Sequence, residues 1–377
     1  MQDLLTALGA QTETLVQTLL AWCALESPSG DPAATSQMAA VLAAYLAARG
    51  AQVDVVPGGV HGAQVRATWP GPADRAPILL LGHHDTVHAH GSLARNPPRV
   101  TAGRAYGPGG YDMKAGLLLA AAAVAALEAT GRPRSRPIIL ISSADEEIGS
   151  QDARPGIEQA ARPAAAVLVL EPAAADGAVK TARKGNGMFT LVARGRAAHA
   201  GVDHAAGINA ITELAHQVLA LSALTDYGAG TTLNVGQIRG GTTINTVAAE
   251  AVAHVDVRAT TLAHAAQISR QILALRPVLP GATLDVTGEF DRPPMERSPG
   301  TLRLFGLAQA LGREIGLALR ETATGGASDG NFTAALGVPT LDGLGACGDG
   351  AHTDHEYVQI ADLAPRAALL AGLLTRI

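Results

Sequence analysis

A histidine and an aspartate stand two residues apart just after a short apolar run, and this spacing can serve a metal ion. The run covers residues 78–81 and is followed by Gly82, His83 and Asp85. In open α/β sheets, the loops at the carboxyl ends of the strands carry the chemistry. His83 can offer one ring nitrogen to a metal while Asp85 accepts the proton on the other nitrogen and so orients the ring. Such a triplet alone is more often a polar turn, so the prediction depends on further ligands.

Other acidic and histidine side chains follow apolar segments or precede a predicted helix. They are Asp112, before an alanine-rich helix, Glu146 and Glu147, after a strand over 137–143, Glu171, after a strand over 166–170, and His352, after a strand over 338–342. Two histidines and three carboxylates on separate loops suit two zinc ions that share one carboxylate. In the adjacent acidic pair, one carboxylate can bind metal while the other takes a proton from water. Paired acids on a loop are more often solvated surface, but their place directly after a buried strand favours the functional interpretation.

The elements that must position these residues alternate between strands and helices. The apolar runs at 78–81, 137–142 and 166–170 are continuous, which indicates strands that are buried on both faces. Residues 113–130 form a predicted alanine-rich helix that ends at Gly131. This alternation predicts an α/β fold, with a mixed, largely parallel sheet that helices cover on both faces.

The pattern changes after about residue 185. Strands are predicted over 188–194, 232–238, 247–257 and 284–286, and helices over 208–221 and 262–275. The order β-α-β-β-α-β is that of a ferredoxin-like layer. We therefore predict a main domain made of residues 1–184 and 292–377, with a ferredoxin-like module of residues 185–291 inserted into it.

The bulk properties of the chain exclude several classes of partner. Its 377 residues carry a net charge of −5 and no basic run longer than two residues, so we expect no nucleic acid and no membrane as a partner. The longest apolar run, residues 116–127, is too short to span a bilayer. Two cysteines are too few for a disulfide framework, and the first residues lack the features of a signal peptide, which together favour a cytoplasmic location.

Five motifs give the chain a resemblance to a known family. They lie at residues 82–87, 106–114, 145–150, 170–172 and 198–201. In this order they resemble the co-catalytic zinc exopeptidases and deacylases, which include aminoacylase, succinyl-diaminopimelate desuccinylase and bacterial glutamate carboxypeptidase. Residues 183–185 and 325–330 are similar to the glutamate carboxypeptidase branch (carboxypeptidase G type). The resemblance implies a zinc-exopeptidase-like catalytic domain and an inserted module that serves as a dimerisation and lid domain.

The resemblance also implies roles for the residues at the strand ends. These roles are metal binding for His83, Asp112, Glu147, Glu171 and His352, orientation of His83 by Asp85, and general base catalysis by Glu146. Asp112 would be shared by both ions, and its peptide bond to Met113 would be cis. The implied cofactor is a pair of Zn²⁺ ions in each subunit, which Co²⁺ or Mn²⁺ can replace.

Six further residues match substrate-binding or catalytic positions of the family. They are His199, Asn245, Arg258, Arg292, Gly326 and Ser328. His199 matches the histidine that polarises the scissile carbonyl, which several members supply across a dimer, and Arg292 matches an arginine for the substrate carboxylate. Without the resemblance, His199 would more often be a loop histidine, and Arg258 could equally be a strand residue paired with Asp256.

The implied activity is hydrolysis of the amide bond before a C-terminal amino acid, with Glu146 taking the proton of the attacking water. An N-acyl-amino-acid deacylase with the same site is the alternative, because both reactions cleave an amide beside a free carboxylate. The expected substrate is a small peptide or an N-acyl amino acid, and the expected assembly is a homodimer through the inserted module. Two rival hypotheses are a serine hydrolase that uses Ser328 and His352, and a non-catalytic metal-binding module with the same fold.

Overall fold

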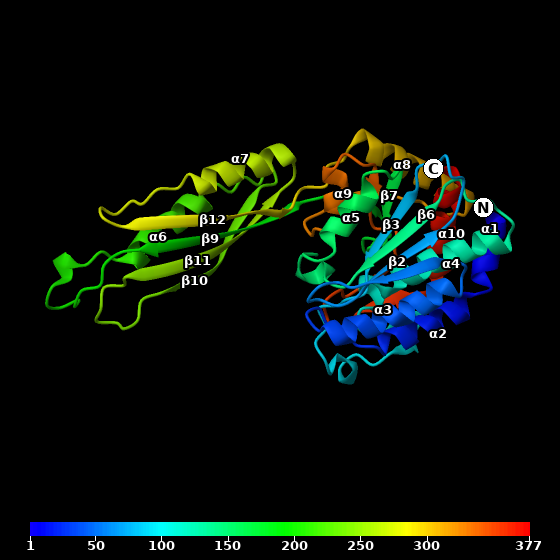
Figure 1. The fold of residues 1–377 in the computed structure, drawn as a ribbon, viewed down its shortest axis with the longest axis horizontal. Coiled ribbons are helices and arrows are strands. Elements are labelled where there is room, and N and C mark those ends of the chain that lie inside the picture. The colour runs from blue at the N-terminus through cyan, green and yellow to red at the C-terminus, as the bar shows by residue number, and fades with distance from the viewer. The chain divides into compact units, whose positions relative to one another are not determined.

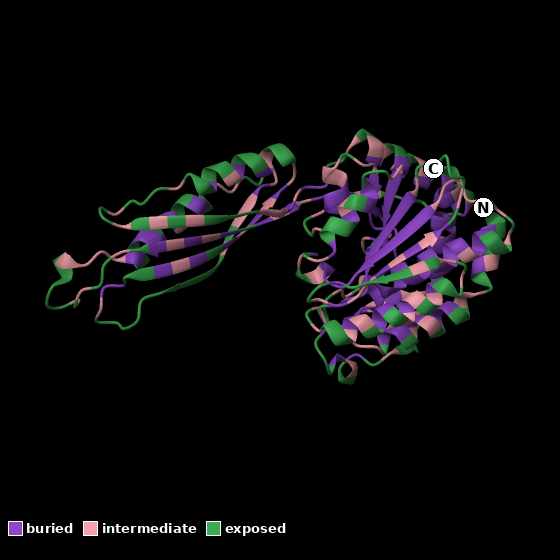
Figure 2. Cartoon of the chain, viewed as in Figure 1, coloured by how far each residue is buried: buried purple, intermediate pink, exposed green.

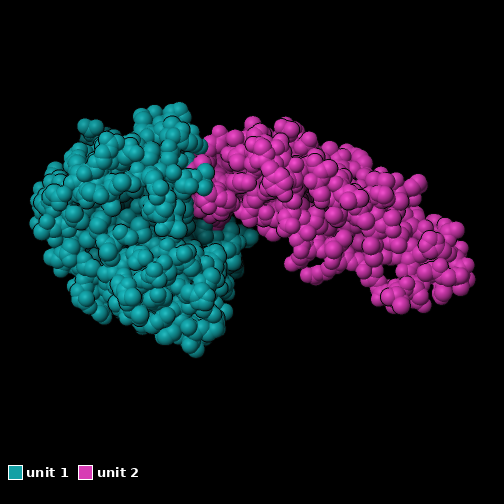
Figure 3. Space-filling view, turned by 180° about the vertical axis from the view of Figure 1, so that it is seen from behind, with its two compact units in different colours: residues 1–181, 297–323, 328–377 teal, residues 182–296, 324–327 magenta.

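The computed structural model describes residues 1–377, and the chain divides into two compact units (Figure 3). Unit 1 consists of Met1–Thr181, Arg297–Ala323 and Ser328–Ile377. Unit 2 consists of Ala182–Glu296 and Thr324–Ala327. The sequence predicts the module over 185–291, whereas the contacts within the structure begin it at Ala182, end it at Glu296 and add the segment Thr324–Ala327.

Unit 1 is built around a six-stranded sheet with the order β1-β2-β6-β3-β7-β14 (Figure 1). Its strands are β1 (Gln52–Val56), β2 (Gln64–Trp69), β3 (Ile78–His83), β6 (Ile138–Ser143), β7 (Ala166–Val169) and β14 (Thr340–Leu341). β6, β3, β7 and β14 run parallel to one another, whereas β2 is antiparallel to both β6 and β1. The predicted α/β fold with a mixed, largely parallel sheet is confirmed.

Helices bury both faces of this sheet, which is why its central strands are purple in Figure 2. The helices of unit 1 are α1 (Gln2–Gly9), α2 (Thr12–Cys23), α3 (Pro32–Ala47), α4 (Ala115–Ala129), α5 (Arg154–Ala161), α8 (Pro299–Glu314), α9 (Gly330–Ala335) and α10 (Ile360–Arg376). Alternate residues of β3 belong to different cores: Ile78 and Leu80 pack with α4 and α10, and Leu79 and Leu81 pack with α5. Burial on both sides explains why the run is apolar throughout.

A continuous helical stretch, Gly110–Ala129, combines a π-helical turn (Gly110–Lys114) with α4. By length and composition it could cross a membrane, and 89% of its most apolar 18-residue stretch is buried inside the structure. The peptide bond between Asp112 and Met113 is cis, as the family resemblance implies. The stretch therefore has two parts, an irregular first turn that carries Asp112 and a regular helix that packs in the core.

Short strands that the sequence did not predict complete the fold. β15 (Gly348–Asp349), β16 (Tyr357–Gln359), β5 (Arg104–Tyr106) and β4 (Arg99–Thr101) form a small sheet in that order, and β8 (Val179–Arg183) pairs with β13 (Glu321–Thr324). The four strands of the small sheet have only two or three residues each, too few to show a period of two in the sequence. The small sheet is important for the site, because β15 and β16 flank the loop that carries His352.

Unit 2 is a four-stranded antiparallel sheet with two helices. Its elements are β9 (Gly185–Arg194), α6 (Ala210–Ser222), β10 (Thr232–Gly240), β11 (Glu250–Ala259), α7 (Leu262–Leu273) and β12 (Thr283–Arg292), and the strand order is β10-β11-β9-β12. Phe189 and Leu191 of β9 share an apolar core with Leu214 of α6 and Ile268 of α7. The predicted β-α-β-β-α-β order of a ferredoxin-like module is confirmed.

Candidate metal centre

The first group of potential metal ligands lies at the carboxyl end of β3. The side chain of His83 is 1% exposed, and its Nδ1 lies 3.0 Å from the backbone oxygen of Asp85 and 3.3 Å from Asp85 Oδ1. Because both of these oxygens are acceptors, the neutral ring carries its proton on Nδ1 and leaves the lone pair of Nε2 for a metal. His83 Nε2 lies 3.3 Å from Asp112 Oδ1 and 3.3 Å from Glu171 Oε1.

The second group shares Asp112 with the first. His352 Nε2 lies 3.3 Å from Asp112 Oδ2 and 3.3 Å from Glu147 Oε2. His352 has a positive φ of 64°, which is uncommon for a residue with a side chain and marks a position that the surrounding structure constrains. Since the two oxygens of Asp112 face different histidines, its carboxylate is placed to bridge two ions. The structure thus brings together all five residues that were predicted as metal ligands.

The spacing of these atoms fits metal ions better than it fits direct hydrogen bonds. Charge-assisted hydrogen bonds between nitrogen and oxygen are about 2.7–2.9 Å long, whereas the four distances here are each 3.3 Å. A tetrahedron with bonds of about 2.0 Å to its centre has edges of about 3.3 Å, which is the ligand spacing around a tetrahedral zinc ion. Asp112 Oδ1 and Glu147 Oε1 are also buried without a hydrogen-bond partner. The donor set therefore suits two transition-metal ions.

The crowded charges shift the pKa values of the potential ligands. Asp112 and Glu147 raise the pKa of His352 to about 10, and burial raises the pKa of the Glu147 carboxyl to about 7. Burial lowers the pKa of His83, but Asp112, Asp85 and Glu171 raise it more, so the net pKa lies well above 6.5. A raised pKa favours the protonated form of His83 and His352, and a metal ion must displace such protons, so metal binding is coupled to proton release.

Glu146, the predicted general base, lies beside this cluster in a short 3₁₀ turn, Glu146–Ile148. Its backbone N–H donates to Asp85 Oδ1 over 3.2 Å, and the N–H of Glu147 donates to Asp85 Oδ2 over 3.2 Å. Its side chain is 8% exposed, and its negative charge contributes to the raised pKa values of His83 and Glu147. Asp85 therefore holds both the ring of His83 and the loop of the acidic pair.

Glu356 supports the site, although no motif in the sequence predicted this role. Its fully buried carboxylate accepts hydrogen bonds from the N–H groups of Tyr111 and Asp112 at Oε1, each over 2.8 Å. At Oε2 it accepts from the N–H of Gly109 over 2.9 Å and lies 2.6 Å from His88 Nε2. It thereby anchors the turn that presents Asp112. The only sequence signal is an acidic residue four positions after His352.

Two of the remaining predicted residues, His199 and Asn245, lie together at one end of unit 2. A bridge pairs His199 with Thr246, and the backbone N–H of Ala200 donates to the backbone oxygen of Asn245 over 2.9 Å. Both side chains are exposed. The N–H of Gly201 donates to His199 Nδ1 over 3.1 Å, which leaves Nε2 of the neutral ring as the proton-bearing nitrogen.

Arg258 and Arg292 lie together at the other end of the same sheet. Both pair with Asn186 at the start of β9, Arg258 from β11 and Arg292 from β12. The guanidinium of Arg258 donates to both carboxylate oxygens of Asp256, over 2.9 and 2.8 Å, as the alternative interpretation of this residue expected. Arg292 is buried, with 5% of its surface exposed.

The two predicted residues of the segment 325–330 have different surroundings. The backbone oxygen of Gly326 accepts from Arg183 Nη1 over 3.1 Å within unit 2. Ser328 is fully buried in unit 1, and its hydroxyl donates to Asp342 Oδ2 over 2.6 Å. His352 directs its Nε2 to Asp112 and Glu147, and no hydrogen bond joins it to Ser328. The substrate contacts of Gly326 and Ser328 stay predictions, and the geometry does not favour a serine nucleophile.

Comparison with known proteins identifies the family. The sequence profile of peptidase family M20/M25/M40 matches residues 79–376, which is most of the chain. The chain belongs to this family. Membership makes it a hydrolase of the metallopeptidase class, in agreement with the resemblance seen in the motifs.

Individual members of the family support the assignment. Carboxypeptidase G2 of Pseudomonas sp. (strain RS-16) is 32% identical over 302 residues, which are 79% of this chain and 73% of that protein. Succinyl-diaminopimelate desuccinylase of Xanthomonas campestris pv. campestris (strain 8004) is 30% identical over 335 residues, which are 82% of this chain and 86% of that protein. The chain is thus similar to a carboxypeptidase and to a deacylase of the same family.

Solved structures show the same fold. An aminopeptidase PepT from Bacillus cereus superposes with a TM-score of 0.79 at 24% identity and covers 97% of this chain and 98% of its own. An M20 family metallo-carboxypeptidase, Sso-CP2 from Sulfolobus solfataricus, has a TM-score of 0.75 at 16% identity and covers 96% of this chain and 98% of its own. These likenesses extend over both units.

Proposed function

We propose that the chain is a two-zinc exopeptidase that hydrolyses the amide bond before a C-terminal amino acid, in the manner of a glutamate carboxypeptidase. The observation that carries this proposal is the convergence of His83, Asp112, Glu147, Glu171 and His352, with Glu146 beside them. A pair of zinc ions, when bound, lowers the pKa of a water molecule and polarises the carbonyl of the substrate. A non-catalytic module would not need Glu146 next to a complete ligand set.

The side chains of the protein perform the remaining steps. Glu146 takes the proton of the attacking water and returns it to the departing nitrogen. His199, through its Nε2 proton, donates a hydrogen bond to the carbonyl oxygen as negative charge develops on it. Arg292 binds the carboxylate of the C-terminal residue and so selects an exopeptidase substrate. The guanidinium of Arg258 is held by both carboxylate oxygens of Asp256.

We further propose that the active unit is a homodimer in which a second copy supplies His199 and Asn245. These residues lie beyond the end of β9 at Arg194, whereas Arg258 and Arg292 lie at its start. From Asn186 to Arg194 a strand rises by about 26 Å, at about 3.3 Å for each residue. A single unit 2 cannot bring both ends of its sheet to the same substrate, because a C-terminal residue and its scissile bond are much shorter than this.

An N-acyl-amino-acid deacylase is the second candidate function. It is supported by the identity with succinyl-diaminopimelate desuccinylase, which is close to the identity with carboxypeptidase G2. Both reactions present an amide beside a free carboxylate, so the same metal centre and the same arginine can serve them. A panel of N-acyl-glutamates, dipeptides and N-succinyl amino acids, assayed with added zinc, separates the two candidates by their kcat/KM values.

The proposal is tested by Glu146→Gln. We expect turnover to fall by about 10²–10⁴-fold, since general base catalysis contributes about this much, while the zinc content stays that of the wild type. Glu147→Gln is the control, because it should lose metal as well as activity. A Glu146→Gln protein with a near wild-type rate would contradict the proposed role. Inhibition by serine-acylating reagents, without inhibition by chelators, would instead favour the serine hydrolase hypothesis.

A further inference from the structure

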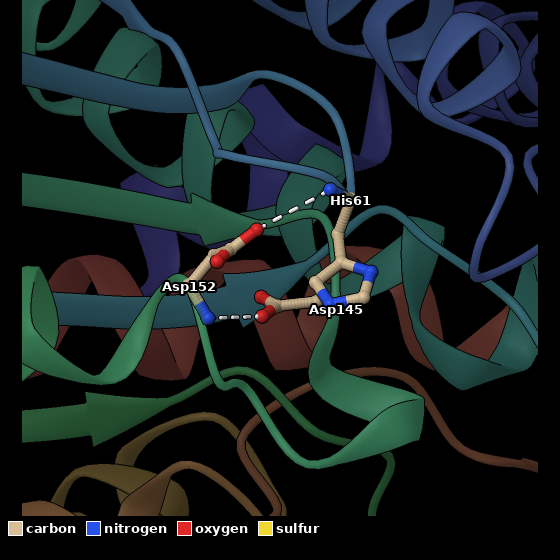
Figure 4. Close-up of side chains that lie close together, drawn as sticks. All are labelled: His61, Asp145 and Asp152. Carbon is tan, nitrogen blue, oxygen red and sulfur yellow. Dashed lines mark hydrogen bonds between the residues drawn. The ribbon is translucent and has the colours of Figure 1, made fainter.

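A third group of potential ligands lies in unit 1 and shares no residue with the paired centre. It consists of His61, in the turn between β1 and β2, Asp145, just after β6, and Asp152, just before α5. One ring nitrogen and one oxygen from each carboxylate lie within 4.8 Å of one another. Figure 4 shows the three side chains side by side, with His61 on a turn that is distant in the sequence from the segment that carries Asp145 and Asp152.

Asp145 supplies the observation that points to a bound cation. Its side chain is fully buried, and its Oδ1 has no hydrogen-bond partner. Its other oxygen, Oδ2, accepts from the backbone N–H of Asp152 over 2.7 Å. A buried carboxylate oxygen without a partner is costly, and buried charges in proteins are normally paired or bound to a metal. No lysine or arginine pairs with this carboxylate.

The other two residues are held in place, and each keeps a potential metal-ligand atom that takes no part in a hydrogen bond. Asp152 Oδ2 accepts from the backbone N–H groups of Val60 and His61, over 3.0 and 3.3 Å, while its Oδ1 accepts none. The turn can approach this closely because residue 59 is glycine: a Cβ there would lie 2.6 Å from Asp152 Oδ2, and the backbone has a φ of +54°. Neither ring nitrogen of His61 takes part in a hydrogen bond. The turn is thus fixed on Asp152 with the imidazole beside both acids.

We propose that His61, Asp145 and Asp152 bind one divalent transition-metal ion, separate from the paired centre. An imidazole nitrogen with two carboxylate oxygens suits zinc and similar ions, whereas calcium and magnesium prefer oxygen ligands alone. Two carboxylates offset the charge of such an ion. His61 and Asp152 are only partly buried, so water can complete the coordination. The ion joins the 58–62 turn to the segment that carries Glu146, which directly follows Asp145, and so serves to position the catalytic loop.

The experiment counts zinc by equilibrium dialysis at a fixed micromolar concentration of free Zn²⁺, followed by elemental analysis. The first protein carries His83→Ala and His352→Ala, which disable the paired centre. We expect this variant to retain one zinc per chain and to lose it when His61→Ala is added. Absence of zinc from the double variant, or zinc that persists after His61→Ala, would overturn the proposal.

A second comparison covers the case in which the double variant does not fold. In the otherwise unchanged chain, His61→Ala and Asp152→Asn should each bind one zinc fewer than the wild type, and zinc should raise their melting temperature less. His204→Ala, which removes an exposed histidine of unit 2, is the control and should keep the wild-type count. Equal counts in His61→Ala and the wild type would contradict the third site. A wild-type count of one that falls to zero in His61→Ala would support the third site and contradict the proposed pair of ions.

Discussion

Asp85 links several parts of the candidate site through one carboxylate. It orients His83, accepts the N–H groups of Glu146 and Glu147, and itself receives the hydroxyl of Ser29 over 2.7 Å. A neutral amide cannot replace it, because one of its two ends would be a donor facing other donors. A single side chain therefore orients His83, a proposed metal ligand, and positions Glu146, the proposed base.

At this scale we predict that Asp85→Asn weakens zinc binding or lowers kcat/KM by about 10–100-fold, the usual effect of losing a residue that orients a metal-bound histidine. The measurement is zinc affinity by competition with a chromophoric chelator, together with steady-state kinetics. Asp54→Asn, an exposed acid on β1, is the control and should leave both quantities unchanged. Unchanged zinc affinity and kinetics in Asp85→Asn would contradict the proposed role of Asp85.

Among the elements, the π-helical turn Gly110–Lys114 depends on Glu356, which directly precedes β16. We predict that Glu356→Gln lowers the free energy of unfolding by about 1–3 kcal/mol, because the amide nitrogen would face N–H donors that lose their acceptor. The affinity for zinc should fall as well, because the backbone N–H of Asp112 loses its hydrogen bond to the carboxylate of Glu356. Urea unfolding and zinc titration check both effects. Glu314→Gln, which removes an exposed ion pair with Arg376, should change stability by less than about 1 kcal/mol.

Helix α6 of unit 2 contains a buried acid, Glu213, that binds a neighbouring loop. Burial raises its pKa, but hydrogen bonds from the N–H of Leu279, from Gln217 and from the N–H of Val278 lower it more, so the net pKa lies below 4.5. A lowered pKa in the folded state means that ionised Glu213 stabilises the protein above about pH 4.5. This contribution is lost as the pH falls through the folded-state pKa.

We therefore predict that Glu213→Gln lowers the free energy of unfolding at pH 7 by about 1.5–3 kcal/mol, the usual value for hydrogen bonds to a charged group. The difference from the wild type should narrow as the pH falls below 4.5. Urea unfolding at several pH values measures it. Glu289→Gln, an exposed acid on β12, should show no such difference at any pH. A difference in unfolding free energy between Glu213→Gln and the wild type that stays constant with pH would contradict the proposed role of the Glu213 charge.

The central elements could be predicted from the sequence because their signal is local. β3, β6 and β7 each begin with a continuous apolar run, and a proposed ligand ends β3 or follows β6 and β7 within a few residues. What could not be predicted depends on contacts across the chain. The hydrogen bond from Tyr111 to Glu356 joins residues 245 positions apart, and His61 meets Asp145 only because the 58–62 turn folds onto Asp152. Contacts between residues that are far apart in the sequence leave no periodic pattern of apolar residues.

For the whole molecule, the proposed exchange of His199 between copies can be tested by mixing two inactive variants. Glu146→Gln and His199→Ala are co-expressed with different tags, so that about half of the dimers contain one chain of each kind. If His199 acts across the dimer, each mixed dimer regains one intact site, and the pooled activity should reach about a quarter of the wild type. A mixture of Glu146→Gln and Glu147→Gln, which lie in the same cluster, should regain none. Failure of the first mixture to regain activity would show that His199 acts within its own chain.

The proposed ligands of the paired centre are spread widely along the chain. His83, Asp112, Glu147 and Glu171 leave the ribosome well before His352, and all of unit 2 is synthesised between them. A nascent chain that has reached unit 2 therefore exposes a partial ligand set with no histidine for the second ion. Two ions can therefore be fully bound at the proposed centre only after His352 has been translated.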